Sequence, residues 1–167
     1  MRHRWSIVAV SILLVLAPAC GVYSTKGRTA GNIKKIAVPN FANETAQPDI
    51  EIDITTNLRN GLIKDNTLKV VPDAEADAVL EGTVVDYRNV PFTFNANLQA
   101  EQYRLTIGLI VSLFNPKDNS YIWKDRNMGA SSDYYLETAT QRDYDKALEE
   151  VYKDIVESIL NATTQEW

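Results

Sequence analysis

Residues 102 to 114, "QYRLTIGLIVSLF", constrain the fold most strongly because apolar and polar side chains alternate along them. A period of two predicts a β-strand with one buried face, and here the second face carries mostly small or polar residues. The apolar side consists of Tyr103, Leu105, Ile107, Leu109, Val111 and Leu113. The rest of the chain must therefore supply a layer that covers one face of a sheet.

The end of the chain can supply that layer. Between residues 142 and 163, apolar side chains recur three and four positions apart, which places them on one side of an α-helix. These residues are Tyr144, Ala147, Leu148, Val151, Tyr152, Ile155, Val156, Ile159 and Leu160. A membrane helix or a coiled-coil seam would show a similar stripe, but the need to cover the sheet favours a core helix.

The remaining elements follow from shorter patterns. Ile50, Ile54, Leu58 and Leu62 predict a helix over 47–65 with Pro48 in its first turn, although 49–54 also alternates like a strand. Strands are expected at 33–41, 68–71, 76–90 and 121–131, the last following a turn at 115–120. The sequence predicts an α+β two-layer sandwich, with two helices packed on one face of a mostly antiparallel four- to five-stranded sheet.

The first nineteen residues have the layout of a secretory signal, with basic residues, a short apolar block and small residues before Cys20. The apolar block is about half as long as a membrane-spanning helix requires. "LAPAC", residues 16 to 20, resembles the bacterial lipobox, with Ala17 where leucine is usual. The resemblance implies cleavage after residue 19 and acylation of Cys20, for example by palmitate; a soluble exported protein with a chance cysteine is the alternative. We expect a signal peptide at 1–19, a lipidated tether at 20–32 and a single domain at 33–167.

Removal of such a leader limits the chemistry that the chain can perform. His3 is the only histidine and Cys20 the only cysteine, so the mature part would hold neither imidazole nor a free thiol. Triads that use histidine, and zinc sites built from histidine or cysteine, are then excluded. The formal charge moves from -5 to -7 as Arg2 and Arg4 leave, which disfavours nucleic acid. We expect no enzymatic activity, no cofactor and no metal site.

Several segments together resemble one known family. "CGVYS" after the leader, "IKKIAVPNFANET", "ADAVLEGTVVDYRNV", "YRLTIGLIVSLF" and the amphipathic closing helix are similar to LptE, the lipopolysaccharide-assembly lipoproteins of Gram-negative outer membranes. The resemblance implies a lipid-anchored protein on the periplasmic side of the outer membrane. It also implies a plug in the lumen of the LptD β-barrel that helps the barrel assemble and binds lipopolysaccharide during its delivery to the outer leaflet. Gly21, in place of an aspartate that retains many lipoproteins in the inner membrane, permits that export.

Lipopolysaccharide presents phosphates beside acyl chains, so basic residues near apolar surface are its expected contacts. The candidates are Arg142, Arg104, Lys124, Arg126 and Arg88. Family members carry a basic residue near the loop before the closing helix, which makes Arg142 the strongest candidate; solvated surface cations are the competing interpretation. Family members also carry basic residues around the preceding hairpin, but 91–102 holds neither lysine nor arginine.

Two other functions remain open. "IAVPNFANET" also resembles the opening strand of outer-membrane lipoproteins of the curli-secretion and penicillin-binding-protein-activator types. Those families tend to carry membrane-inserting hairpins, which the sequence does not reveal. A periplasmic hydrolase working through paired carboxylates is the second alternative, and it requires two acidic residues facing each other in a cleft.

Overall fold

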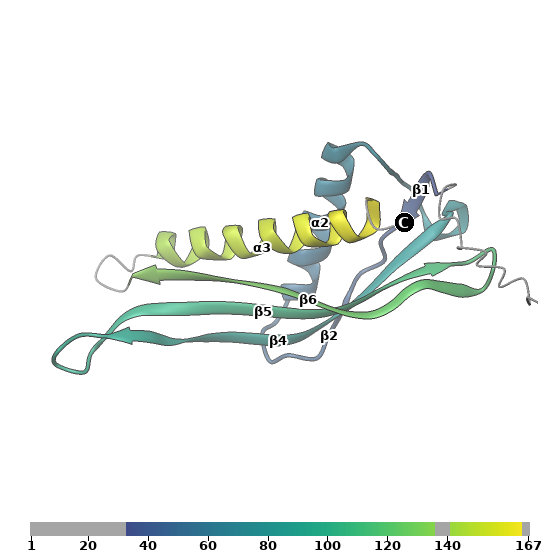
Figure 1. Ribbon diagram of the computed structural model, residues 1–167. Helices are drawn as coiled ribbons and strands as arrows, with labels where there is room; N and C mark the ends of the chain where they lie inside the picture. Colours follow the sequence, from purple (N-terminus) through teal and green to yellow (C-terminus); the bar gives the residue numbers. More distant parts are fainter. Residues whose placement is uncertain (1–32, 136–140, 165–167) are drawn as a thin grey trace, which may run out of the picture.

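A computed structural model describes residues 33–135 and 141–164 (Figure 1). Its elements are, in chain order, β1 (Lys35–Ala37), β2 (Ala42–Asn43), α2 (Ile50–Asp65), β3 (Lys69–Val70), the 3₁₀ turn η1 (Asp73–Glu75), β4 (Ala78–Phe94), β5 (Ala100–Asn115), β6 (Ser120–Tyr135) and α3 (Gln141–Thr164). The predicted signal peptide, the tether and Cys20 lie outside the described residues.

The strands form a single mixed sheet in the order β3-β1-β4-β5-β6, with β2 also paired to β4. β4, β5 and β6 run antiparallel, whereas β1 is parallel to both β3 and β4, and β2 is parallel to β4. The α+β class is confirmed, but the expected four to five mostly antiparallel strands are replaced by six strands of mixed direction. Strands of two or three residues are too short to show a period of two, and α2 supplies the crossover that lets β1 and β3 lie parallel.

Helix α2 forms because its apolar residues recur every fourth position. Ile50, Ile54, Leu58 and Leu62 are all buried, so the helical period prevails over the competing alternation at 49–54. Pro48 is not in the first turn as expected, because the helix begins only at Ile50, after Asp49 in a left-handed conformation.

The three long strands have 17, 16 and 16 residues. β4 extends beyond the predicted end at residue 90, through Pro91 to Phe94. Proline is tolerated there because the strand bulges between Pro91 and Thr93, and among described residues β4 pairs only with β5 beyond Val84.

The core lies between the two helices and one face of the sheet. Leu105, Ile107, Leu109, Val111 and Leu113 of β5 are all fully or nearly fully buried, which confirms the predicted alternation. They pack with the apolar sides of α2 and α3, including Val151, Ile155 and Ile159. Figure 1 shows α3 running along β6 and β5 on this side, and its bounds match the predicted closing helix. None of the helices in the described residues has the length and apolar character needed to cross a membrane.

Two close contacts tie α2 to its neighbours. Thr55, fully buried, accepts a hydrogen bond from the Phe41 N–H at 3.1 Å and donates one to the Glu51 carbonyl at 2.6 Å. Where α2 meets α3, a Cβ atom built on Gly61 would lie well inside the van der Waals distance of Val156 Cγ1. The two helices therefore approach closely because residue 61 has no side chain.

Candidate interaction surface on the three long strands

The half of the three long strands away from β1 is the part of the sheet that extends beyond the short strands. We call β4 from Asp86 to Phe94, β5 from Ala100 to Gly108 and β6 from Gly129 to Tyr135 the distal ribbon. In Figure 1 it extends to the left of β2, with α3 along one face and the β4–β5 turn at its end. The face opposite the helices is called the outer face below. It carries Glu81, Thr83, Asp86, Arg88, Val90, Arg104, Thr106, Gly108, Ile110, Ser112, Asn127, Gly129, Ser131 and Asp133, as the strand register shows.

Arg104 is held in place on this outer face. Its Nε donates to Asp133 Oδ1 and its second guanidinium nitrogen to Oδ2, both at 2.7 Å. The guanidinium carbon lies 3.3 Å from the centroid of the Phe92 ring. The hydrogen bonds between the pair raise the pKa of Arg104 and lower the pKa of Asp133. Arg104 is thus a fixed, paired cation beside an aromatic ring.

Arg88 lies on the same face and is also paired. Its guanidinium contacts the Asp86 carboxylate at 2.8 to 3.1 Å, and 63% of its side chain is exposed. An anion that approaches either arginine must therefore compete with a carboxylate already bound to it.

Lys124 and Arg126 lie at the other end of β6. Lys124 is 3.6 Å from Asp125, and the Arg126 guanidinium lies 4.9 Å from the centroid of the Trp123 ring. Arg126 and Asp133 are seven positions apart along the strand, which corresponds to about 23 Å. The structure therefore divides the predicted cations into two groups and does not bring them into one cluster.

Arg142 is the second residue of α3, and its side chain lies outside the part of the chain that the structure describes. The start of this helix is fastened to the distal ribbon by tyrosines. The hydroxyl groups of Tyr87 and Tyr144 are 2.6 Å apart, and the rings of Tyr134 and Tyr144 meet edge to face with centroids 5.9 Å apart. Burial raises the pKa of Tyr87, which keeps its hydroxyl group protonated. The first turn of α3 is thus fixed beside the end of β6.

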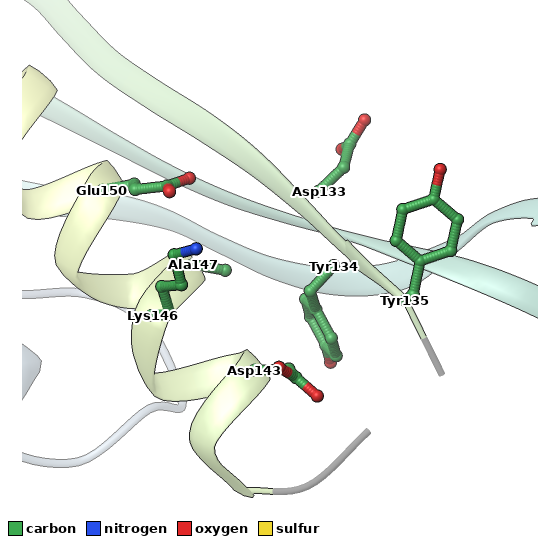
Figure 2. Close-up of a pocket in the computed structure, with 7 residues that line it drawn as sticks. All are labelled: Asp133, Tyr134, Tyr135, Asp143, Lys146, Ala147 and Glu150. Atoms are coloured by element: carbon green, nitrogen blue, oxygen red, sulfur yellow. The ribbon is translucent and has the colours of Figure 1, made fainter. Parts of the chain in front are cut away.

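A small hollow of about 170 Å³ lies between the end of β6 and the first turns of α3. Figure 2 shows Tyr134 pointing from β6 toward Asp143 of the helix. The lining residues are Asp133, Tyr134, Tyr135, Asp143, Lys146, Ala147 and Glu150. Asp143 and Glu150 supply two carboxylates against the single ammonium group of Lys146, and the Asp133 carboxylate is paired with Arg104, so the hollow is poorly suited to phosphate. It is also too small for the acyl chains of a lipid.

A larger groove of about 870 Å³ runs between α2 and α3. Gly61, Val156 and Leu160 contribute apolar surface, and the charged residues are Asp53, Lys64, Asp65, Glu149, Lys153 and Glu157. Charges of both signs around apolar surface suit contact with another protein better than contact with a polyanion. The pKa values of Asp77 and Asp133 are lowered by their hydrogen bonds, so neither residue suits the role of the general acid of a hydrolase.

The end of the β4–β5 hairpin is a feature that the sequence analysis missed. Phe92, Phe94 and Leu98 have 45%, 56% and 84% of their surface exposed, and Val90 and Tyr135 nearby are also exposed. Val90, Phe92 and Phe94 occupy alternate positions, which was a usable signal for a strand with an apolar side. The sequence revealed no hairpin of the membrane-inserting kind that curli-secretion lipoproteins tend to carry. Because this chain has a hairpin with an exposed apolar end, that objection to the curli-secretion type no longer applies.

The fold is similar to that of solved lipoprotein structures. Rare lipoprotein B from Shewanella oneidensis superposes with a TM-score of 0.56 at 16% identity, covering 77% of this chain and 92% of that chain. Uncharacterized lipoprotein B from Nitrosomonas europaea gives 0.52 at 14% identity, covering 80% and 81%. A PelC dodecamer from Paraburkholderia phytofirmans gives 0.50 at 18% identity, covering 80% and 88%. At these identities the likeness concerns the fold alone.

The family is shown by a different comparison. No curated protein matches the chain. The family model described as "LptE: Lipopolysaccharide-assembly" matches residues 33–163, from two residues before β1 to one residue before the end of α3. This match confirms the resemblance found in the sequence. The chain belongs to the LptE family of lipopolysaccharide-assembly proteins.

Proposed function

We propose that this protein is an outer-membrane lipoprotein that plugs the lumen of an LptD-type β-barrel, helps that barrel assemble and binds lipopolysaccharide during its insertion into the outer leaflet. The observation that carries the proposal is the family match over residues 33–163, which spans every described strand. The activity is one of assembly and binding, without catalysis.

The outer face of the sheet supports the plug role. The lumen of a membrane β-barrel is polar, so a plug needs a polar surface with few protruding side chains. Gly108 pairs with both Asp86 and Gly129 across this face, and Thr106 pairs with Arg88 and Ser131. The 16-residue strand β5 is about 50 Å long, which exceeds the roughly 25 Å apolar band of an outer-membrane barrel. The ribbon is thus long enough to extend through such a lumen.

Lipopolysaccharide contact is proposed at Arg142 and Arg104 first. Arg104 combines a guanidinium group with the adjacent Phe92 ring, the pairing of cation and apolar surface that a phosphate beside an acyl chain requires. Arg88 lies two residues along the same face, while Lys124 and Arg126 are remote and have lower priority. Binding at Arg104 would require the phosphate to displace Asp133.

Membrane attachment is proposed through acylation of Cys20, which becomes the first residue of the mature protein. Two or three acyl chains give stable anchoring, whereas one chain gives only reversible binding. Intact mass measurement of the membrane-extracted protein tests this directly. A Cys20→Ala chain should retain the folded domain and leave the membrane fraction; a variant that stays in the membrane without its barrel would contradict the anchor.

Copurification tests the plug role. The protein is extracted from outer membranes without crosslinking, washed in detergent, and the components that remain are identified. A large β-barrel in stoichiometric amount is expected. A ring of identical subunits, or a penicillin-binding protein, would overturn the proposal.

Lipopolysaccharide binding is tested with the purified protein and charge-reversal variants. Arg142→Glu should weaken binding several-fold, while Lys124→Glu, the same change at the remote end of β6, should leave it nearly unchanged. Equal effects of the two variants would show that general charge, and not a site near α3, controls binding.

A further inference from the structure

Exposed apolar side chains are concentrated at one end of the molecule. Of the seven large hydrophobic residues that are exposed in the described chain, five lie at the end of the distal ribbon. They are Val90, Phe92, Phe94, Leu98 and Tyr135, and the other two lie on α2. We call Phe92, Phe94 and Leu98 the apolar tip. A concentration of this kind marks a surface that meets an apolar partner.

The same segment carries no charge. The twelve residues from Asn89 to Ala100 include no acidic and no basic side chain, in a protein with 39 charged residues. A loop that faced bulk water, or the polar wall of a barrel lumen, would gain nothing from excluding charge. Exclusion of charge suits an environment of low dielectric constant, where an ion is costly.

Leu98 occupies an unfavourable backbone conformation. Its φ of 60° lies in the left-handed region, at the position of a hairpin turn where glycine or asparagine is usual. Its side chain is 84% exposed, so packing within the chain does not compensate for the strain. A strained and exposed leucine at this position points to a contact outside the molecule.

Four backbone N–H groups of the turn are hydrogen-bonded within the turn itself. Asn95 N–H donates to the Gln99 carbonyl at 2.9 Å, and Leu98 N–H donates to the Asn95 carbonyl at 3.0 Å. The Asn95 side-chain oxygen accepts from the N–H groups of Asn97 and Gln99 at 2.9 and 3.0 Å. These four N–H groups therefore lose little hydrogen bonding if the turn leaves water, which is a condition for entering lipid.

The residues behind the tip follow the order of a membrane interface. The pair Phe94–Ala100 is followed by Glu101, Tyr135 and then the Arg104–Asp133 ion pair. Tyrosine is enriched where hydrocarbon meets headgroups. The turn extends about three residues, or about 10 Å, beyond Phe94, which matches the depth reached by elements that lie in the interface.

We propose that the apolar tip is a lipid-insertion element that enters the hydrocarbon boundary of a bilayer. The insertion is shallow and places Phe94 and Leu98 among the acyl chains, with Tyr135 and the ion pair at the headgroups. It goes beyond the proposed plug function, because it concerns the lipoprotein that is not enclosed in a barrel and requires neither the barrel nor lipopolysaccharide. The absence of charge in the turn and the internal hydrogen bonds of four of its N–H groups favour lipid over a polar protein wall.

The test places an environment-sensitive fluorophore on the tip of the full lipoprotein. Ala96→Cys introduces a thiol in the turn without removing any residue of the tip, and Asp118→Cys does the same in the β5–β6 turn at the opposite end of the sheet. The chain without a new thiol sets the background. Each protein is reconstituted in phosphatidylethanolamine–phosphatidylglycerol vesicles with and without lipids that carry a doxyl quencher on the acyl chain.

The label at position 96 should shift to shorter wavelength and be quenched several-fold by the doxyl lipid, while the label at 118 should not. Adding Phe94→Asn and Leu98→Asn to Ala96→Cys should reduce the quenching at least fivefold without lowering the unfolding temperature, because asparagine suits the left-handed position. Three outcomes would overturn the proposal. The emission of the tip label could stay at the wavelength of a label in water, or it could shift without vesicles because a second copy covers the tip. The label could also be shielded from water only when the barrel is present. Each leaves the plug proposal standing, since copurification tests that separately.

Discussion

The guanidinium group of Arg104 lies against the ring of Phe92, with 3.3 Å between the guanidinium carbon and the ring centroid. The same group binds Asp133 through two hydrogen bonds. Arg104 therefore connects all three long strands on the outer face, with Phe92 on β4 and Asp133 on β6. Both contacts depend on the planar shape of the guanidinium group, which lysine does not share.

This arrangement predicts that Arg104→Gln lowers the urea midpoint of unfolding more than Arg88→Gln does. Arg104 loses a two-point ion pair and a cation–π contact, whereas Arg88 loses only a pair with a nearby residue of its own strand. Chemical denaturation at low and high salt measures both variants. Equal midpoints would mean that the Phe92 and Asp133 contacts contribute no more stability than the Arg88–Asp86 pair.

Asp77 predicts a loss of stability in acid. The Lys117 ammonium and the N–H groups of Lys34 and Lys35 hold the pKa of Asp77 at about 2, below its ordinary 3.8. Because the folded-state value is the lower one, the stabilisation is complete above about pH 4 and disappears as the pH falls to about 2. Asp77→Asn keeps an oxygen for the two N–H groups but no charge. The free energy of unfolding of this variant should therefore change less between pH 6 and pH 2 than that of the parent chain. Identical pH dependence would contradict the assignment.

Thr55→Val should destabilise the protein by about 1–3 kcal/mol, because the buried Phe41 N–H loses its acceptor. Thr163→Val is the matched control. Thr163 is also fully buried in a helix and donates to the carbonyl four residues earlier, but it has no acceptor role toward a separate segment in the hydrogen bonds of the described chain. We expect that change to cost less than about 1 kcal/mol. Thermal and urea unfolding of both variants measure the difference.

Gly61→Ala distinguishes helix propensity from packing. Propensity alone predicts a gain of about 1 kcal/mol for alanine in a helix. The new methyl group meets Val156, whose branched side chain has little freedom to move, so we expect a loss of about 1–3 kcal/mol. Val156→Ala added to Gly61→Ala should recover part of the loss. A stabilising single substitution would show that the helices separate at little cost.

The elements with long periodic patterns were predictable from the sequence, and those without were not. The bounds of α3 and the buried face of β5 followed from recurrences that extend over a dozen residues or more. β2 and the parallel direction of β1 escaped prediction, since pairings such as Ile36 with Ala78 leave no mark in a local pattern. The predicted strand ended at residue 90, but β4 continues through Pro91 to Phe94, because the missing N–H of a proline is harmful only where a second strand pairs on that side.

The predicted site was limited by the same lack of register. Arg104 and Asp133 are 29 residues apart, and only the alignment of β5 with β6 brings them together. The register likewise separates Arg126 from the arginines of the outer face. Charge pairing that depends on long-range register cannot be predicted from single residues. The alternation of Val90, Phe92 and Phe94, in contrast, is a local pattern that could have been predicted from the sequence.

The parallel contacts of β1 also determine when the N-terminal third of the chain can fold. A nascent chain emerges from its N-terminus, so β1 and α2 appear long before β4 and β5, with which they share a core. Until about residue 113 has emerged, Ile50, Ile54, Leu58 and Leu62 have no sheet to cover them. The hairpins of β4, β5 and β6, in contrast, join neighbouring segments and close rapidly. During synthesis, therefore, α2 is the element that chiefly needs protection from aggregation, because its apolar side is made before the sheet that covers it.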